Sequence, residues 1–198
     1  MKYLWMVILF TVLPLYASSA ANMEKVSIKT SVIFNTQCAK CHEGECSGRL
    51  SFDTGSKAAS SHIGRYSGDV NITKKKTKEF FSLLNYMKTE CALWMPGINK
   101  LKLENFSRFA LPSSKGYFIP LGTLEEGNYH IKIQLKENMH FDFEILSDHF
   151  KHFLDVSVCP DKKQIFQFII DRTVNTFLRI KSRIPLEVID INLKKINK

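Results

Sequence analysis

Two cysteines separated by two residues and followed directly by a histidine constrain this chain more than any other feature. The segment reads Cys38-Ala39-Lys40-Cys41-His42. This spacing is the attachment signature of a c-type haem, in which both sulfurs form thioethers to the porphyrin and the imidazole binds the iron. The sequence therefore predicts one covalent haem c, attached through Cys38 and Cys41, with His42 as the proximal iron ligand.

A redox CxxC pair or a zinc site also contains two cysteines at this spacing. A thioredoxin-like pair starts a helix after a hydrophobic strand, and a structural zinc needs a second ligand pair at similar spacing. The other cysteines, Cys46, Cys91 and Cys159, stand alone and far apart. Haem attachment therefore fits the sequence better than either alternative.

Residues 1–21 have the composition of a secretory signal peptide. Lys2 gives a positive start, residues 4–16 are almost uninterruptedly apolar, and residues 18–21 are small. The apolar run, about 13 residues, is shorter than the roughly 20 that span a bilayer. We expect export to a bacterial periplasm, where haem is attached and disulfides form, with membrane contact at most peripheral or through an uncleaved leader.

The rest of the chain divides into two parts with different patterns. Residues 22–111 contain helix-like segments, whereas residues 117–198 alternate apolar and polar positions between short turn signals. A short stretch with proline, serine and glycine separates them at residues 111–116. We predict an α+β protein, with an all-α haem domain over residues 22–111 and a small antiparallel β-sandwich of jelly-roll or immunoglobulin-like type over residues 117–198.

Three helices and seven strands are expected. The helices cover residues 27–36, 74–94 and 103–111, and a long polar loop with several glycines is expected over residues 43–73. The strands cover residues 117–121, 129–135, 141–145, 153–158, 164–170, 176–180 and 186–193.

The first part resembles the class I c-type cytochromes. In that family a helix precedes CxxCH, and a methionine, often in a Met-Pro pair, supplies the second axial ligand from a loop before the last helix. The haem motif, followed by Met95-Pro96 and the helical segment at residues 103–111, has the same order. The resemblance covers about residues 23–111 and implies that Met95 is the distal iron ligand.

His62 is the alternative distal ligand. It follows His42 after a polar stretch, and a second imidazole gives the iron a lower reduction potential than a thioether does. Arg65 and Tyr66 are candidate partners of the haem propionates, because a guanidinium and a phenol can hold carboxylates.

Three cysteines remain once the haem has taken two. A disulfide between Cys46 and Cys91 would join the segment after the haem motif to the segment before Met95, and it would close a loop of about 45 residues. Cys159 would then be a free thiol or a link to another chain.

Charge and the lack of catalytic motifs indicate the class of function. No Ser-His-Asp order, acid/base carboxylate pair or phosphate loop can be recognised, and the histidines of the second part match no known metal-ligand spacing. Residues 23–110 contain 14 Lys and Arg against 8 Asp and Glu, and residues 111–198 contain 13 against 11. This excess, densest at residues 74–78, predicts docking to an acidic redox protein rather than to nucleic acid.

We therefore expect an exported monohaem cytochrome that exchanges electrons with a redox partner protein and is not itself an enzyme. A haem enzyme or gas sensor with an open iron site is one alternative. A binding module whose β domain recognises a glycan or a protein is another.

Overall fold

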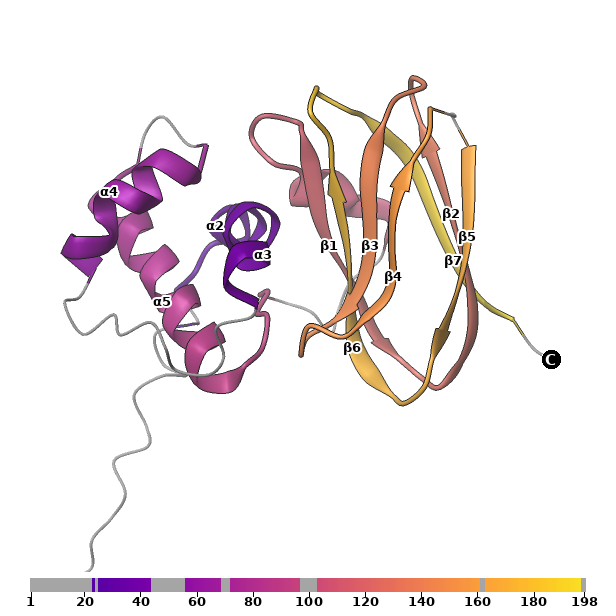
Figure 1. Ribbon diagram of the computed structural model, residues 1–198, viewed down its shortest axis with the longest axis horizontal. Helices are drawn as coiled ribbons and strands as arrows, with labels where there is room; N and C mark the ends of the chain where they lie inside the picture. The colour runs from indigo at the N-terminus through magenta and orange to yellow at the C-terminus, as the bar shows by residue number, and fades with distance from the viewer. Residues whose placement is uncertain are drawn as a thin grey trace, which may run out of the picture.

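A group of N-terminal helices is followed by two antiparallel sheets of four and three strands, which pack as a sandwich (Figure 1). This arrangement confirms the α+β class. The computed structural model describes residues 23, 25–43, 56–68, 72–96, 103–160 and 163–196. The predicted signal peptide lies outside the described residues and stays a prediction.

The predicted helices are present with changed bounds. A continuous helical path consists of α2 (Ile28–Ile33), a π-helical turn (Phe34–Cys38) and α3 (Ala39–His42), so it carries the whole haem motif. The next predicted helix, α5 (Lys74–Glu90), ends before Trp94 because Cys91 adopts a left-handed backbone with φ of 51°. The third is a 3₁₀ helix, Leu103–Phe109. None of the described helices is long and apolar enough to span a bilayer.

The long loop predicted over residues 43–73 is wrong in part, because it contains the helix α4 (Ser56–Tyr66). Serines and Gly64 give this segment a low intrinsic helix propensity, which hid the helix in the sequence. The sequence signal for this helix is the spacing of Ala59 and Ile63, which are four residues apart and both buried. Tertiary packing on α5 therefore stabilises a helix that propensity does not favour.

The start of the helical path is fixed to α5 by one buried carboxylate. The Ser27 hydroxyl caps α2 by accepting from the backbone N–H of Thr30. Glu79 of α5 in turn accepts from the hydroxyls of Ser27 and Thr30 at 2.9 and 2.6 Å. This contact sets the direction in which the path approaches the sheets.

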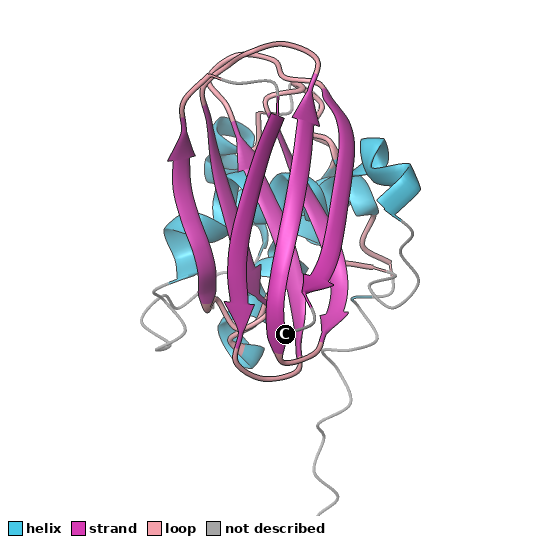
Figure 2. Cartoon of the chain, turned by 90° about the vertical axis from the view of Figure 1, so that its right-hand side faces the viewer, coloured by secondary structure: helices cyan, strands magenta, loops and turns pink. Residues whose placement is uncertain are grey.

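All seven predicted strands are confirmed. They are β1 (Gly116–Leu124), β2 (Gly127–Leu135), β3 (Phe141–Ser147), β4 (His152–Val158), β5 (Lys163–Ile170), β6 (Val174–Lys181) and β7 (Val188–Ile196). The four-stranded sheet has the order β1-β6-β3-β4 and the three-stranded sheet the order β5-β2-β7, with antiparallel pairing throughout. Figure 2 views the molecule from the sandwich side, with the helices behind the strands.

The four-stranded sheet is covered on both faces. Consecutive residues of β3 and β6 are buried, as expected for strands with packing on both sides. One face meets the three-stranded sheet, and α2 and the π-helical turn lie against the other face at β1 and β6 (Figure 1). Burial alternates along β2, so one face of the outer sheet is more open to solvent.

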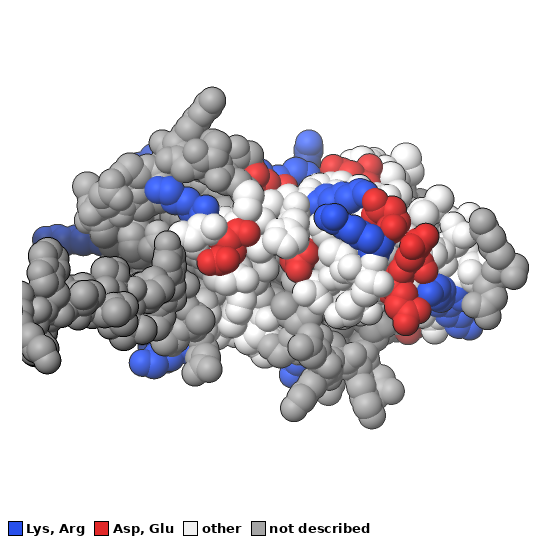
Figure 3. Space-filling view, turned by 90° about the horizontal axis from the view of Figure 1, so that it is seen from below, with Lys and Arg blue, Asp and Glu red and all other residues white. Residues whose placement is uncertain are grey.

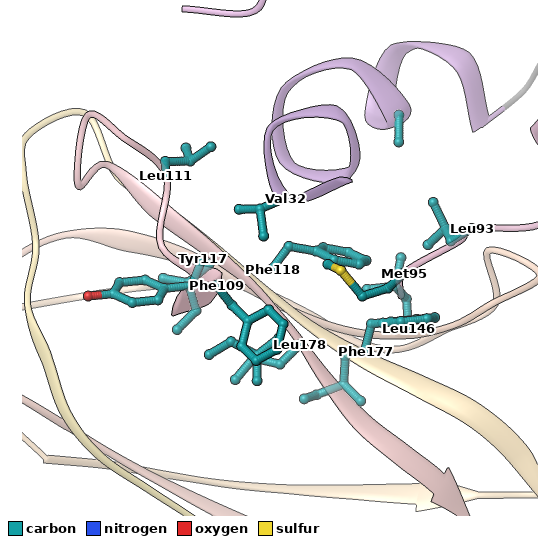
Figure 4. Packing of buried hydrophobic residues seen from close by; sticks show 14 of the residues in the cluster. Val32, Leu93, Met95, Phe109, Leu111, Tyr117, Phe118, Leu146, Phe177 and Leu178 are labelled. Carbon is teal, nitrogen blue, oxygen red and sulfur yellow. The ribbon is translucent and has the colours of Figure 1, made fainter. Parts of the chain in front are cut away.

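Aromatic residues join the helices to this sheet. Phe118 of β1 stacks on Phe177 of β6 with ring centroids 5.0 Å apart, and Val32 of α2 lies close by (Figure 4). One hydrophobic cluster of buried residues includes members of the helices and of both sheets. The apolar core therefore crosses the domain boundary predicted at residues 111–116.

We expect Phe177→Ala to lower the free energy of unfolding by about 3 to 5 kcal/mol, because it leaves a cavity in the core shared by helices and sheet. Since that core is shared, Trp94 fluorescence and sheet circular dichroism should report one common denaturation midpoint in the wild-type protein. Ile169→Ala, at a position 66% exposed, is the control and should cost about 0.5 kcal/mol or less. Separate midpoints for the two probes would contradict a shared core.

Candidate functional site

The haem motif presents its chemistry on one helix face. Residues at positions i, i+3 and i+4 are neighbours on a helical surface, so Cys38, Cys41 and His42 lie together. Cys41 is exposed, and Cys38 and His42 are half-buried. Ala39, by contrast, is fully buried, and Lys40 reaches the four-stranded sheet. The motif therefore groups two sulfurs and an imidazole along one side of the helix, with Cys41 exposed and Cys38 packed in part against the core.

The imidazole of His62, on α4, lies near the imidazole of His42. Their ring centroids are 6.3 Å apart and their planes meet at 71°. A metal–nitrogen bond is about 2 Å long, and the ring centroid lies about 1 Å beyond the nitrogen. Two histidines on opposite sides of one metal therefore have centroids about 6 Å apart. The centroid distance of His42 and His62 is thus compatible with both imidazoles binding one metal ion.

The two predicted propionate partners follow His62 on α4. Tyr66 lies one turn after His62, with the ring centroids 4.7 Å apart, and is 55% exposed. Arg65 is exposed on the same helix. The structure brings Tyr66 to the histidine pair, and the propionate contacts stay a prediction.

Met95, the distal ligand implied by the family resemblance, is a core residue in this structure. It is 2% exposed and lies among Phe118, Leu146 and Phe177 (Figure 4). These three residues belong to the sheet face that the helices cover. A thioether against aromatic rings is an ordinary packing contact, so packing alone accounts for Met95.

Hydrogen bonds fix the segment around Met95 from two sides. The amide nitrogen Nδ2 of Asn35, in the π-helical turn, donates to the carbonyl of Trp94 at 2.9 Å. The backbone N–H of Leu93 donates to the carbonyl of Asp148, after β3, at 2.7 Å. The segment is therefore held in place between the helical path and the sandwich.

A network of charges with a buried centre lies under the motif. Glu144 of β3 and Arg179 of β6 are cross-strand neighbours, 1% and 0% exposed, joined by a 2.8 Å bond from Nη1 to Oε2. Lys40 donates from Nζ to Oε1 of Glu144 at 2.7 Å, and Arg179 donates from Nη2 to Glu43. We call these four residues, Lys40, Glu43, Glu144 and Arg179, the Arg179 network.

The charges of this network are mutually stabilised. Burial would raise the pKa of Glu144, but the charge of Arg179 and the hydrogen bond from Lys40 outweigh it and hold that pKa below its ordinary value. Burial would likewise lower the pKa of Lys40, and the hydrogen bond and charge of Glu144 outweigh it, so that pKa is raised. Both shifts favour the charged forms of Lys40 and Glu144.

His152 borders the network and lies near three of its carboxylate neighbours. Its ring nitrogens lie 3.6 Å from carboxylate oxygens of Glu43 and Asp155 and 3.9 Å from Glu144. Within the described part of the chain, Glu144, His152 and Asp155 form the one group of three side chains spaced to hold a metal. Because Lys40 and Arg179 already bind both carboxylate oxygens of Glu144, a cation would have to displace them.

The cysteine pair does not have the electrostatics of a redox CxxC. Burial, with the Cys41 charge as a smaller cause, raises the pKa of Cys38 to about 12, although Lys181 opposes this. Thiol–disulfide exchange requires a lowered pKa, because the thiolate is the nucleophile. In the described ranges, no group of three metal-ligating side chains includes Cys38 or Cys41. The redox and zinc alternatives thus gain no support.

The other cysteines keep their predicted roles untested. Cys159 is an exposed free thiol after β4. Cys46 lies outside the described residues, so its disulfide with Cys91 stays a prediction. Cys91 ends α5, and its carbonyl lies 3.1 Å from Nδ1 of His149.

Comparison with protein-family models, curated proteins and solved structures finds no match to this chain. The resemblance to class I c-type cytochromes therefore rests on the haem motif and on Met95-Pro96. Function has to be inferred from the chemistry and geometry of the residues themselves.

We expect the stability contribution of Glu144 to be lost in acid. Its pKa is lower in the folded protein than the ordinary 4.5, so the contribution is complete above pH 4.5 and declines as the pH falls through the folded value. The free energy of unfolding, measured by urea titration from about pH 5 to pH 3, should therefore fall less steeply in Glu144→Gln than in the wild type. Asp190→Asn, at an exposed position of β7, is the matched control and should keep the wild-type slope.

Proposed function

We propose that this chain is an exported monohaem c-type cytochrome that transfers electrons to or from a redox partner protein. Cys38 and Cys41 hold the haem through thioethers, and His42 binds the iron. The observation that carries the proposal is the shared helix face of these residues, with His62 at an axial-ligand spacing from His42. When bound, the haem supplies an iron that alternates between two oxidation states.

The finer fold assignments belong to the same proposal. The helical part is a variant of the class I c-type cytochrome domain, and the sandwich is of jelly-roll or immunoglobulin-like type. The secretory leader delivers the chain to a bacterial periplasm. There the Cys46–Cys91 disulfide can form.

His62 is the proposed second axial ligand, in place of Met95. Two observations support this choice, the 6.3 Å between the imidazole centroids and the burial of Met95 in the core. An iron with two histidine ligands has no open coordination position. This favours electron transfer over an enzyme or a gas sensor, and a lower potential than a His/Met haem.

Lysines at the start of α5 support an acidic partner. Lys74, Lys75 and Lys76 occupy the first turn of this helix, and that turn contains no acidic residue. Positive charge at a helix N-terminus opposes the macrodipole, so these lysines do not stabilise the helix. On the face in Figure 3, acidic and basic side chains are interleaved over the sandwich, and basic groups extend toward the helical end. A binding role for the lysines explains why they are placed there.

Expression with export in a bacterium that attaches haem tests the cofactor. The purified wild-type protein should carry the mass of one haem that survives denaturation, because the thioethers are covalent. Cys38→Ala and Cys41→Ala should each lose at least one thioether, and the double variant should lose covalent haem entirely. Cys159→Ala, which removes an exposed cysteine outside the motif, is the control and should keep the haem. An exported wild-type protein free of haem would overturn the proposed function.

The axial ligand is tested by carbon monoxide binding to the reduced protein. His62→Ala should open a coordination position and bind carbon monoxide rapidly, whereas the wild type should not. Met95→Leu is the matched comparison, since this volume-conserving swap costs under about 1.5 kcal/mol and should leave the haem spectrum unchanged. Rapid binding in Met95→Leu together with none in His62→Ala would reverse the ligand assignment.

A further inference from the structure

We propose that the Arg179 network sets the reduction potential of the haem, so that the sandwich is part of the redox site. This inference rests on the proposed function. It assigns a role to the strand residues Glu144 and Arg179, which lie far from the haem motif in sequence.

The network contacts the haem motif through two residues that flank His42 and are bound to the sheet. Lys40 precedes His42 by two residues, and Glu43 follows it directly. Lys40 is bound to Glu144 at 2.7 Å, and Glu43 is bound to Arg179. The short helix α3 is therefore held on both sides of His42 by strands β3 and β6, which fixes the backbone that carries the imidazole. Glu144 and Arg179 act as positioning residues in this respect.

The same charges act on the iron through space. Arg179 is 0% exposed and Glu144 is 1% exposed, so water and salt screen them weakly. The iron gains one positive charge on oxidation. A nearby cation therefore stabilises the reduced form and raises the potential, and a nearby anion lowers it.

The packing of the helices on the sheet does not require these charges. The same sheet face already joins the helices through Phe118, Phe177 and Leu146, which are apolar and fully buried. Burying ion pairs carries a desolvation cost, and well-packed apolar residues often replace such pairs without loss of stability. Among the described contacts of this face, the buried charges gather under the haem motif. This placement indicates a role connected with the motif.

Potentiometry of the haem-loaded full chain tests the inference. Lys40→Met removes a positive charge and should lower the midpoint potential, whereas Glu43→Gln removes a negative charge and should raise it. A purely structural role would not give shifts of opposite sign. Lys40→Arg keeps the charge and should restore the wild-type potential. Glu144→Gln, which leaves the motif sequence intact, should raise the potential as Glu43→Gln does.

The matched control is an exposed ion pair beside the three-stranded sheet, one residue after β2 and one residue before β7. Lys136 and Glu187 are bonded at 2.8 Å and are 60% and 62% exposed. Lys136→Met and Glu187→Gln should leave the potential unchanged, because solvent screens both charges. Equal potentials in wild type, Lys40→Met, Glu43→Gln and Glu144→Gln, all carrying haem, would overturn the inference and leave the cytochrome proposal standing. Absence of haem from the wild-type protein would instead remove the proposal itself.

Discussion

The packing of one helical path on the four-stranded sheet determines most of this structure. It buries a second face of β3 and β6, brings Val32 and Met95 against Phe118 and Phe177, and encloses the Arg179 network. Burial of aromatic side chains supplies the favourable free energy of this contact. The ion pairs of the interface instead determine how α3 is oriented on the sheet, since they form only at a fixed geometry. On this sheet face, apolar contacts therefore provide stability and ionic contacts provide a defined orientation.

The strands could be predicted from sequence because their apolar residues alternate. In β3, for example, Phe141, Phe143 and Ile145 alternate with Asp142 and Glu144, which defines the strand and its inner face. The same pattern suggests that Glu144 is exposed, yet it is 1% exposed. A polar residue on the outer face of a strand becomes buried only when another element covers it, and strand periodicity contains no information about that cover.

The haem motif could be found from sequence, but its surroundings could not. Spacing identifies Cys38, Cys41 and His42 because thioether attachment requires those residue types at short range. The approach of His62 depends instead on α4, whose serines and glycine conceal a helix that packing stabilises. Met95-Pro96 has the order expected of a ligand, but sequence order does not show which way a side chain points.

The π-helical turn at Phe34–Cys38 has a consequence for the angular position of the cysteines. A π-helix closes its hydrogen bonds one residue later than an α-helix, so it inserts one residue into the helical rotation. One residue corresponds to about 100° of rotation around an α-helix axis. The buried residues of α2 precede this turn, and the exposed cysteine of the motif, Cys41, follows it. A chain lacking one residue here would rotate Cys41 by about a quarter of a circle or slightly more, so the accessibility of its sulfur depends on the rotation of the helix as well as on the motif.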